Sequence, residues 1–276
     1  MTEIMNRFDR DTTVTPSGNG RYEVLIDRGW WIIRGPNGGY IAAILAKAAE
    51  HAAADTNKPL RSLTIHFLRP PQEGPAHVET VVERVGRTLT TVTARLIQNG
   101  KLQALATAAH AVPREMDGFV HVEMPDVRPP GECATREHPT DRDMPSLHDR
   151  YEQRFAIGPA LFSEEARTRE ARTGGWIRLR EPRPWDTAEV AAISDAWPPA
   201  VFASRDMPPT SGGVPTIDLT VHILAPEALA SLKPDAFLLV DFTTRAVQGG
   251  YLEEDGEIWS EDGRLLAQAR QVGVVL

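Results

Sequence analysis

The chain has 276 residues, of which 41% are hydrophobic and 25% charged, so it can bury a substantial core and is not disordered as a whole. At about 150 residues per domain, this length indicates two domains or one large domain built from two units. Its 38 acidic and 30 basic residues give a net charge of -8 without a basic run, which argues against nucleic acid as a partner.

The first residues, MTEIMNRFDRDTTV, carry charges where a signal peptide needs an apolar stretch. No later segment approaches the roughly 18 uncharged apolar residues of a membrane span. We therefore expect a cytoplasmic protein with no membrane partner. The single cysteine, Cys133, excludes an internal disulfide and a cysteine-based metal cluster.

The first half predicts a helix followed by four strands. Residues 39–54 are alanine-rich, contain no proline and follow the turn-like Gly-Pro-Asn-Gly-Gly, which predicts a helix. Segments rich in Val, Thr, Ile and Leu predict strands at 63–68, 77–85, 89–98 and 102–112. Asn99-Gly100 predicts a hairpin turn between the last two.

The second half has the same plan after residues 113–150, which are rich in Pro, Asp, Glu and Arg and are typical of a surface connector. A helix is predicted at 186–197, with Asp186 or Thr187 as its N-cap and Pro198-Pro199 at its end. Strands are predicted at 217–224, 237–247, 251–259 and 264–275, with Asp262-Gly263 as the matching hairpin turn.

An internal repeat explains this shared plan. The segment LTIHFL at 63–68 returns as LTVHIL at 219–224, an offset of 156, and NGKLQALATAAHAV from Asn99 returns as DGRLLAQARQVGVV from Asp262, an offset of 163. WIIRGP from Trp31 also resembles WIRLREP from Trp176. We expect an α+β protein with an N-terminal unit at 1–112, a connector at 113–150 and a C-terminal unit at 151–276. One helix and a run of antiparallel strands fit a sheet wrapped around a central helix, and two copies fit a fused symmetric dimer with its sheets joined edge to edge.

Several motifs in order resemble the acyl-CoA thioesterase II family: FLRPP at 67–71, then VETVVERVGRT, TARLIQNGK and the closing ARQVGVV. The resemblance covers the chain from about Arg34 to Leu276. It implies a TesB-like double hotdog, with two tandem hotdog units that each wrap an antiparallel sheet around a central helix. It also implies an enzyme of lipid and fatty acid metabolism that hydrolyses acyl-CoA to free acid and CoA without a metal or cofactor.

The same resemblance assigns a catalytic set that holds and activates a water molecule. ISDAW supplies Asp195, TID supplies Thr216, and RQVG supplies Gln271. A carboxylate can take a proton from the attacking water, while neutral hydroxyl and amide groups can fix the position of that water. Gly38 and Gly39 open the first helix and are candidates for substrate binding, since backbone N–H groups at a helix start can stabilise an oxyanion.

The repeat tests this set independently of the family. By the two offsets, the first half has apolar residues at the positions of the catalytic set: Leu60 for Thr216, Ala108 for Gln271, and a residue near Ala49 for Asp195. We therefore expect the C-terminal unit to carry the catalysis.

Two details of the site are also predicted. Asp195 should lie near the end of the second helix, where the dipole disfavours a negative charge and raises the pKa of the carboxyl group. Strand alternation places Asp218 on the same face as Thr216, as a supporting partner or a rival carboxylate.

Other interpretations stay open at this point. Taken singly, Asp195 could be a solvated helix residue, and Thr216 and Gln271 ordinary strand positions. A protein that binds acyl-CoA or an acyl carrier without catalysis would suit the same fold. A hydratase or dehydratase is disfavoured because it usually has a histidine a few residues after the Asp, and here AWPPA follows. Joined sheets commonly leave a further interface, so we expect a homo-oligomer, either a dimer or a tetramer.

Overall fold

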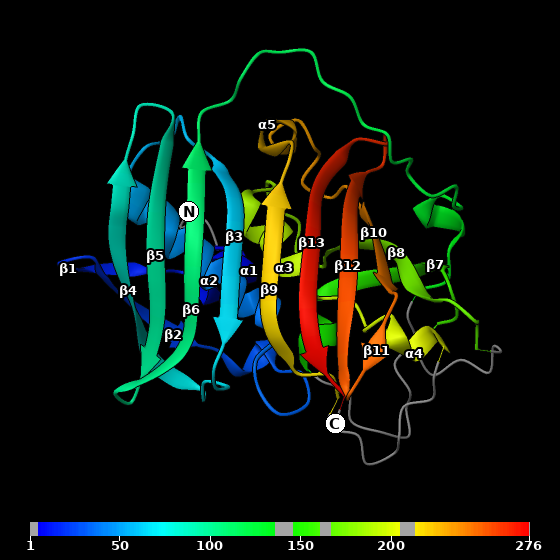
Figure 1. The fold of residues 1–276 in the computed structure, drawn as a ribbon, viewed down its shortest axis with the longest axis horizontal. Helices are drawn as coiled ribbons and strands as arrows, with labels where there is room; N and C mark the ends of the chain where they lie inside the picture. Colours follow the sequence, from blue (N-terminus) through cyan, green and yellow to red (C-terminus); the bar gives the residue numbers. More distant parts are fainter. Residues whose placement is uncertain (1–4, 136–145, 161–166, 205–212, 276) are drawn as a thin grey trace.

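The computed structural model describes residues 5–135, 146–160, 167–204 and 213–275. Within these ranges the strands form one antiparallel sheet, with the helices α2 and α3 behind it (Figure 1). The strand order is β1-β2-β4-β5-β6-β3-β9-β13-β12-β10-β8-β7, and β11 pairs with β12. This is the double hotdog architecture of the α+β class.

The first half contributes β1 (Thr15–Gly18), β2 (Arg21–Ile26), β3 (Leu60–Phe67), β4 (Gly74–Val85), β5 (Leu89–Gln98) and β6 (Lys101–Ala111). The second contributes β7 (Tyr151–Ile157), β8 (Ala171–Leu179), β9 (Thr216–Ile223), β10 (Leu238–Thr244), β11 (Val247–Gln248), β12 (Tyr251–Ser260) and β13 (Leu265–Val274). The α-helices are α1 (Arg7–Asp11), α2 (Gly38–Ala53), α3 (Thr187–Ile193), α4 (Val201–Ser204) and α5 (Pro226–Leu229).

The two halves meet at the contact of β3 with β9 and are related by an approximate two-fold axis. Moving outward from this contact, β3, β6, β5, β4, β2 and β1 correspond in order to β9, β13, β12, β10, β8 and β7. Thr64 and Thr220, which occupy equivalent positions in the repeat, pair with each other, and their hydroxyl oxygens are 3.1 Å apart. The axis therefore passes between these two threonines, and the sheets join edge to edge as expected.

Helix α2 begins at a side-chain cap and runs along the centre of the first half. The side chain of Asn37 accepts a hydrogen bond from the backbone N–H of Tyr40, and the helix ends at Ala54, which has a left-handed φ of 50°. Its alanines up to Ala49 are buried and allow close packing against β4, β5 and α3. The helix predicted at 39–54 is thus confirmed.

The strand predictions are mostly confirmed. The four in the first half correspond to β3, β4, β5 and β6, with ends that differ by at most three residues. Asn99 and Gly100 both have positive φ in the hairpin turn. In the second half, β9, β12 and β13 match their predictions. The strand predicted at 237–247 is divided into β10, which ends at Thr244, and the short β11.

The second helix is shorter than its prediction at 186–197. Of the two predicted N-caps, Asp186 and Thr187, the structure has Asp186. Helix α3 ends already at Ile193. The backbone N–H groups of Asp195 and Ala196 bond to carbonyls three residues earlier, so the last turn tightens before Pro198 is reached. Asp195 consequently lies outside the helix.

The outer strands β1, β2, β7 and β8 were not predicted from the sequence. The similarity of WIIRGP to WIRLREP is not a structural equivalence. Trp176 lies within β8, whereas Trp31 follows the 3-10 turn Arg28–Trp30. A tryptophan can be buried from a strand or from a loop, so a match of a few residues around it does not define a register.

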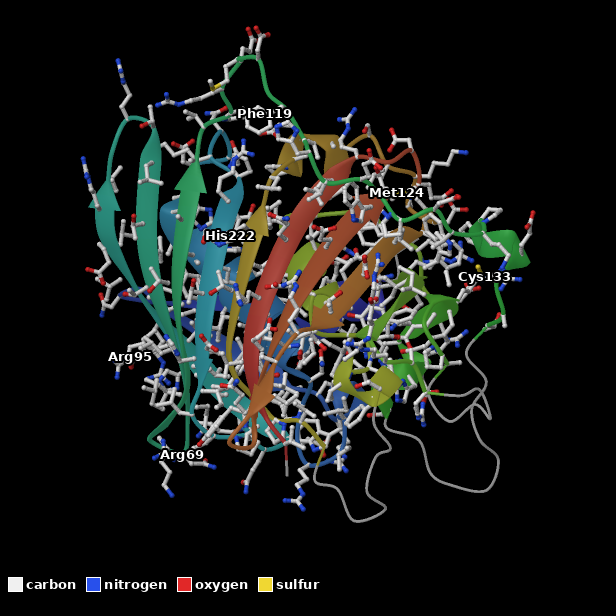
Figure 2. The ribbon with its side chains drawn as sticks, turned by 45° about the vertical axis from the view of Figure 1, so that its right-hand side comes forward. Arg69, Arg95, Phe119, Met124, Cys133 and His222 are labelled. Atoms are coloured by element: carbon white, nitrogen blue, oxygen red, sulfur yellow. The ribbon has the colours of Figure 1, made fainter. Side chains whose placement is uncertain are left out.

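The connector crosses the ends of the strands after β6 and then packs on part of the outer face of the second half (Figures 1 and 2). Its residues Met124, Val127 and Cys133 pack on a small apolar cluster with the strand residues Trp176 and Trp259. Strand β10 is consequently buried on both faces. Residues 136–145 of the predicted connector lie outside the described residues.

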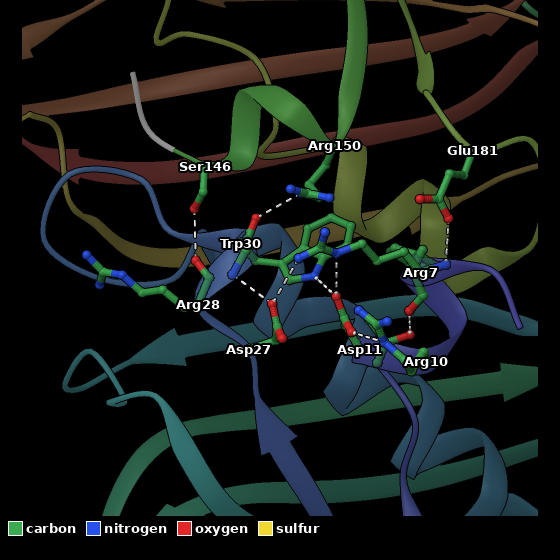
Figure 3. A network of polar contacts seen from close by, with 12 residues as sticks. Arg7, Arg10, Asp11, Asp27, Arg28, Trp30, Ser146, Arg150 and Glu181 are labelled. Carbon is green, nitrogen blue, oxygen red and sulfur yellow. Dashed lines mark hydrogen bonds and ion pairs between the residues drawn. The ribbon is translucent and has the colours of Figure 1, made fainter. Parts of the chain in front are cut away.

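A polar network ties the N-terminal segment to the second half (Figure 3). The backbone N–H of Arg7 donates to Glu181 at 2.9 Å, and Arg150 Nε donates to the carbonyl of Gly29 at 3.1 Å. Asp11 accepts from the buried indole N–H of Trp30 at 2.9 Å. These bonds hold α1 and the loop before α2 in place, and with them the start of α2.

Candidate active site

Asp195 contacts the start of α2 from the turn that follows α3. Its Oδ2 accepts hydrogen bonds from Asn37 Nδ2 at 2.9 Å and from the backbone N–H of Gly39 at 3.0 Å. Asn37 Nδ2 also donates to the backbone carbonyl of Asp195 at 2.7 Å. The carboxyl group of one half is therefore held at the positive end of the helix of the other half.

Gly38 and Gly39 make this approach possible. A Cβ at Gly39 would lie 2.1 Å from the carbonyl oxygen of Ala192, and one at Gly38 would lie 2.8 Å from Asp195 Oδ2. Neither position has room for a side chain. In the structure these glycines position α2 against Asp195, and the backbone N–H of Gly39 is bonded to the carboxyl group.

The pKa of Asp195 is raised from its ordinary value of 3.8 to about 6, mainly because the carboxyl group is buried. The N–H groups of Gly39 and Gly38, the Asn37 amide and the Thr216 hydroxyl oppose the rise without cancelling it. The pKa of Asp195 shifts in the predicted direction, but burial causes the shift, whereas the prediction named the helix dipole. The nearest helix end is the positive start of α2, which lowers this pKa. At neutral pH Asp195 is mostly ionised and able to accept a proton.

Thr216 and Gln271 form a chain of hydrogen bonds beside Asp195. Thr216 Oγ1 donates to Gln271 Oε1 at 2.8 Å, and Gln271 Nε2 donates to Glu254 Oε1 at 2.7 Å. Glu254 Oε2 accepts from the backbone N–H of Ala200 at 2.5 Å. The Thr216 hydroxyl is also within hydrogen-bond reach of Asp195, whose pKa it lowers, so the structure brings Asp195, Thr216 and Gln271 together.

Asp218 does not belong to this group. The register of β9 with β13 steps between Val272 and Gly273, which pair with Asp218 and Thr216, so Ile217 is an extra residue in the ladder. Such a bulge interrupts strand alternation. Thr216 therefore faces Gln271, while Asp218 accepts from the backbone N–H of Val272 at 3.2 Å. The expectation that Asp218 shares the face of Thr216 is wrong because alternation fails at the bulge.

The pairing of strands also identifies the equivalent positions in the first half. The same bulge occurs there, between Leu60 and Ser62. Gln271 pairs with Glu254, and its counterpart Ala108 pairs with Val92. The first half therefore has three buried apolar residues, Leu60, Val92 and Ala108, where the second has Thr216, Glu254 and Gln271.

Two polar residues of the site were missed in the sequence. Asn37 directly precedes a helix, which is the position of an N-cap, and this signal could have identified it. Glu254 is only 3% exposed and lies in a strand with several other acidic residues. An alignment of β12 with β5 would have shown it opposite Val92.

This arrangement suits the activation of a water molecule. It combines a carboxylate of raised pKa with a neutral hydroxyl and an amide, and these lie at a helix start that can bind negative charge. Among the described residues, no group of three or more His, Cys, Asp or Glu side chains could hold a metal ion. None of the helices in the described ranges has the length and apolar character of a membrane span.

Comparison with protein families decides the assignment. Residues 130–275 match the family model of the acyl-CoA thioesterase C-terminal domain, and residues 27–112 match that of the N-terminal domain. The chain belongs to the acyl-CoA thioesterase family. It is a TesB-like thioester hydrolase. No curated protein matches its sequence.

Solved structures include similar chains over nearly the full length. A hot dog fold protein of unknown function from Alicyclobacillus acidocaldarius is 29% identical, with 99% of each chain covered and a TM-score of 0.88. A protein from Thermobifida fusca assigned as a thioesterase II is also 29% identical, covers 99% of this chain and 98% of its own, and has a TM-score of 0.85. The acyl-CoA thioesterase II TesB2 of Mycobacterium marinum shares the fold, with 18% identity, 98% of each chain covered and a TM-score of 0.75.

Proposed function

We propose that this thioester hydrolase cleaves fatty acyl-CoA to the free acid and CoA by water attack, with Asp195 as the general base. The observation that carries the proposal is the convergence of Asp195, Thr216 and Gln271 at the start of α2. A base with a pKa near 6 is ionised at neutral pH and still basic enough to accept a proton in the transition state.

In the proposed reaction, Asp195 and Thr216 hold the attacking water. The water oxygen forms a bond to the thioester carbonyl carbon while Asp195 accepts one of its protons. The carbonyl electrons move to the oxygen and give a tetrahedral oxyanion. When these electrons return, the carbon–sulfur bond breaks and the CoA thiolate leaves, taking the proton from Asp195.

The start of α2 is also our candidate for the substrate carbonyl. Its first turn supplies the backbone donors nearest to Asp195, and the N–H of Gly39 is bonded to that carboxyl group. We therefore propose that Gly38 and Gly39 line the position of the thioester, where the helix dipole would stabilise the oxyanion.

Exposed apolar side chains on the segments that carry or precede the site residues support an acyl substrate. Leu68 is 47% exposed and follows Phe67, whose ring reaches the vicinity of Gly38. Ile217, beside Thr216, is 39% exposed, and Ile33 in the loop before α2 is 48% exposed. Covering such surfaces with a hydrocarbon chain would remove apolar area from water, which favours binding.

The test compares Asp195→Asn with the wild type on acyl-CoA thioesters of several chain lengths, with release of free thiol as the readout. Asp218→Asn is a matched control, because it neutralises a nearby carboxylate on the other face of β9. We expect about a 100- to 10,000-fold loss of kcat in Asp195→Asn and little change in the control. Undiminished hydrolysis by Asp195→Asn would overturn the mechanism.

The same proposal places the catalytic residues in a C-terminal unit, residues 151–276, and treats residues 1–112 as a unit that supplies the start of α2. The cytoplasmic location and the homo-oligomeric state expected from the sequence stay predictions. Size measurement in solution would decide between a monomer, a dimer and a tetramer.

A further inference from the structure

Glu254 is a buried carboxylate of the site that takes no part in the proposed water attack. It lies on β12 and faces Gln271 on β13. Each of its oxygens has a donor: the backbone N–H of Ala200 at 2.5 Å for Oε2 and Gln271 Nε2 at 2.7 Å for Oε1. Burying a carboxylate is costly, so its presence where the first half has Val92 calls for a reason.

The bonds of Glu254 determine the direction of the whole hydrogen-bonded chain. Burial raises the pKa of Glu254 to about 7, and above this pH its ionised carboxylate only accepts hydrogen bonds. Gln271 must then turn its NH₂ group toward Glu254. The carbonyl oxygen of Gln271 then faces Thr216, whose hydroxyl donates to it at 2.8 Å. A hydroxyl has one hydrogen, so Thr216 is left with only lone pairs for its other neighbours.

This direction matters for the water. A water molecule attacks through a lone pair on its oxygen, so both of its hydrogens should point away from the thioester carbon. Asp195 can accept one of them, and Thr216 can accept the other only if its own hydrogen is used elsewhere. The Thr216 hydroxyl is also within reach of Asp195, whose pKa it lowers when it donates there. A hydrogen committed to Gln271 therefore leaves Asp195 the stronger base.

We propose that Glu254 is a positioning residue that, through Gln271, keeps Thr216 as a hydrogen-bond acceptor for the attacking water. The inference rests on the function proposed for Asp195 and Thr216. In this inference Glu254 fixes the orientation of the Gln271 amide, and the amide oxygen of Gln271 then accepts the hydroxyl hydrogen of Thr216.

The substitution Glu254→Gln reverses the direction of the hydrogen bonds from Thr216 through Gln271 to residue 254. The new amide satisfies Ala200 with its oxygen and presents its NH₂ group to Gln271. The amide of Gln271 must then turn over, and its NH₂ group donates to Thr216. The hydroxyl hydrogen of Thr216 is thereby redirected toward the water or Asp195.

We expect Glu254→Gln to lower kcat by about 10- to 100-fold and to change KM by less than about twofold. Glu257→Gln is the matched control. Gln268 Nε2 donates to Glu257 at 3.3 Å, and these residues form a Gln–Glu pair between the same two strands, three positions from Glu254 and Gln271 along each strand. The control should keep the wild-type kcat.

The double variant Glu254→Gln/Gln271→Glu restores the original direction. Its amide can accept from Ala200 and donate to the new carboxylate, which accepts from Thr216. We expect this swap to recover at least about tenfold of the lost kcat, measured at a pH where the carboxylates are ionised. A merely structural role of Glu254 predicts instead that Glu254→Gln, where it is folded, has the wild-type kcat, so that the swap has nothing to recover.

The outcomes separate the inference from the proposed function. If Asp195→Asn is inactive while folded Glu254→Gln keeps the wild-type kcat, only the inference is overturned. The inference also fails if the swap folds but recovers nothing. If Asp195→Asn remains fully active, the proposed mechanism itself is wrong. Because the swap keeps every hydrogen bond of the chain, it tests the inference even if Glu254→Gln is poorly folded.

Discussion

Asn37 offers a way to change the basicity of Asp195 without touching the base itself. Its Nδ2 donates to Asp195 Oδ2 at 2.9 Å, while its Oδ1 caps α2 by accepting from Tyr40. Asn37→Asp keeps the shape and the capping oxygen but removes the donor and adds a negative charge. We expect the pKa of Asp195 to rise.

The size of the shift follows from the lost hydrogen bond. A hydrogen bond to a charged group contributes about 1.5–3 kcal/mol, and one pKa unit corresponds to about 1.4 kcal/mol. Loss of the bond therefore raises the pKa by about 1 to 2 units, before the added charge is counted. Because Asp195 acts in its ionised form, kcat/KM should fall at low pH, with a midpoint near 6 in the wild type. In Asn37→Asp we expect this midpoint at about pH 7–8.

The assay is kcat/KM for acyl-CoA hydrolysis between about pH 5 and 9, since this quantity reports ionisations of the free enzyme. Asn37→Ser is the control for charge, because serine can cap the helix but cannot replace both amide donors. It should shift the midpoint in the same direction by a smaller amount. If both variants keep the midpoint of the wild type, Asp195 is not the group that limits the reaction at low pH.

Three further outcomes are expected. Thr216→Ser should retain most of the activity, whereas Thr216→Val, which lacks the hydroxyl, should lose about 10- to 100-fold in kcat in thiol-release assays. Gly39→Ala should destabilise the fold by about 1–3 kcal/mol or more in denaturant unfolding, because its Cβ would lie 2.1 Å from a backbone carbonyl oxygen, whereas Gly131→Ala meets no atom within 4 Å and should be nearly neutral. Arg183→Ala should lower the free energy of unfolding by about 1–3 kcal/mol, because it leaves the buried Glu189 without its partner at 2.7 Å. Burial raises the pKa of Glu189 to about 8, so the unpaired carboxyl group binds a proton at neutral pH; an unchanged melting temperature would contradict the prediction.

Local patterns in the sequence were sufficient for much of the fold. The alanine-rich helix, the hairpin at Asn99-Gly100 and most of the central strands depend on nearby residues, and the structure confirms them. The outer strands β1, β2, β7 and β8 were not predicted. β1 pairs with its neighbour β2, and β7 with its neighbour β8. The alternation of exposed and buried residues in β2 is a local signal that could have identified that strand.

The repeat in the sequence also predicted much of the site. It aligned Thr216 with Leu60 and Gln271 with Ala108, and the strand registers of the two halves agree with both alignments. A polar residue in one copy and an apolar residue in the other is visible without any structure. The same comparison would have identified Glu254 had the alignment extended across β12.

Other features depended on contacts between segments far apart in the chain. The bulge at Ile217 turns Thr216 toward Gln271 and leaves Asp218 on the other face of the strand. Strand alternation alone would place both residues on one face. The setting of Asp195 is decided by the start of α2, more than 150 residues away, which approaches because Gly38 and Gly39 leave room.

The sequence by itself determined the duplication and which copy carries the polar residues, because both are properties of residue types in order along the chain. The tertiary structure decided the pKa of Asp195 and the direction of the hydrogen-bonded chain from Glu254 to Thr216. Burial and hydrogen-bond direction depend on which groups meet in space, and here those groups come from both halves of the molecule.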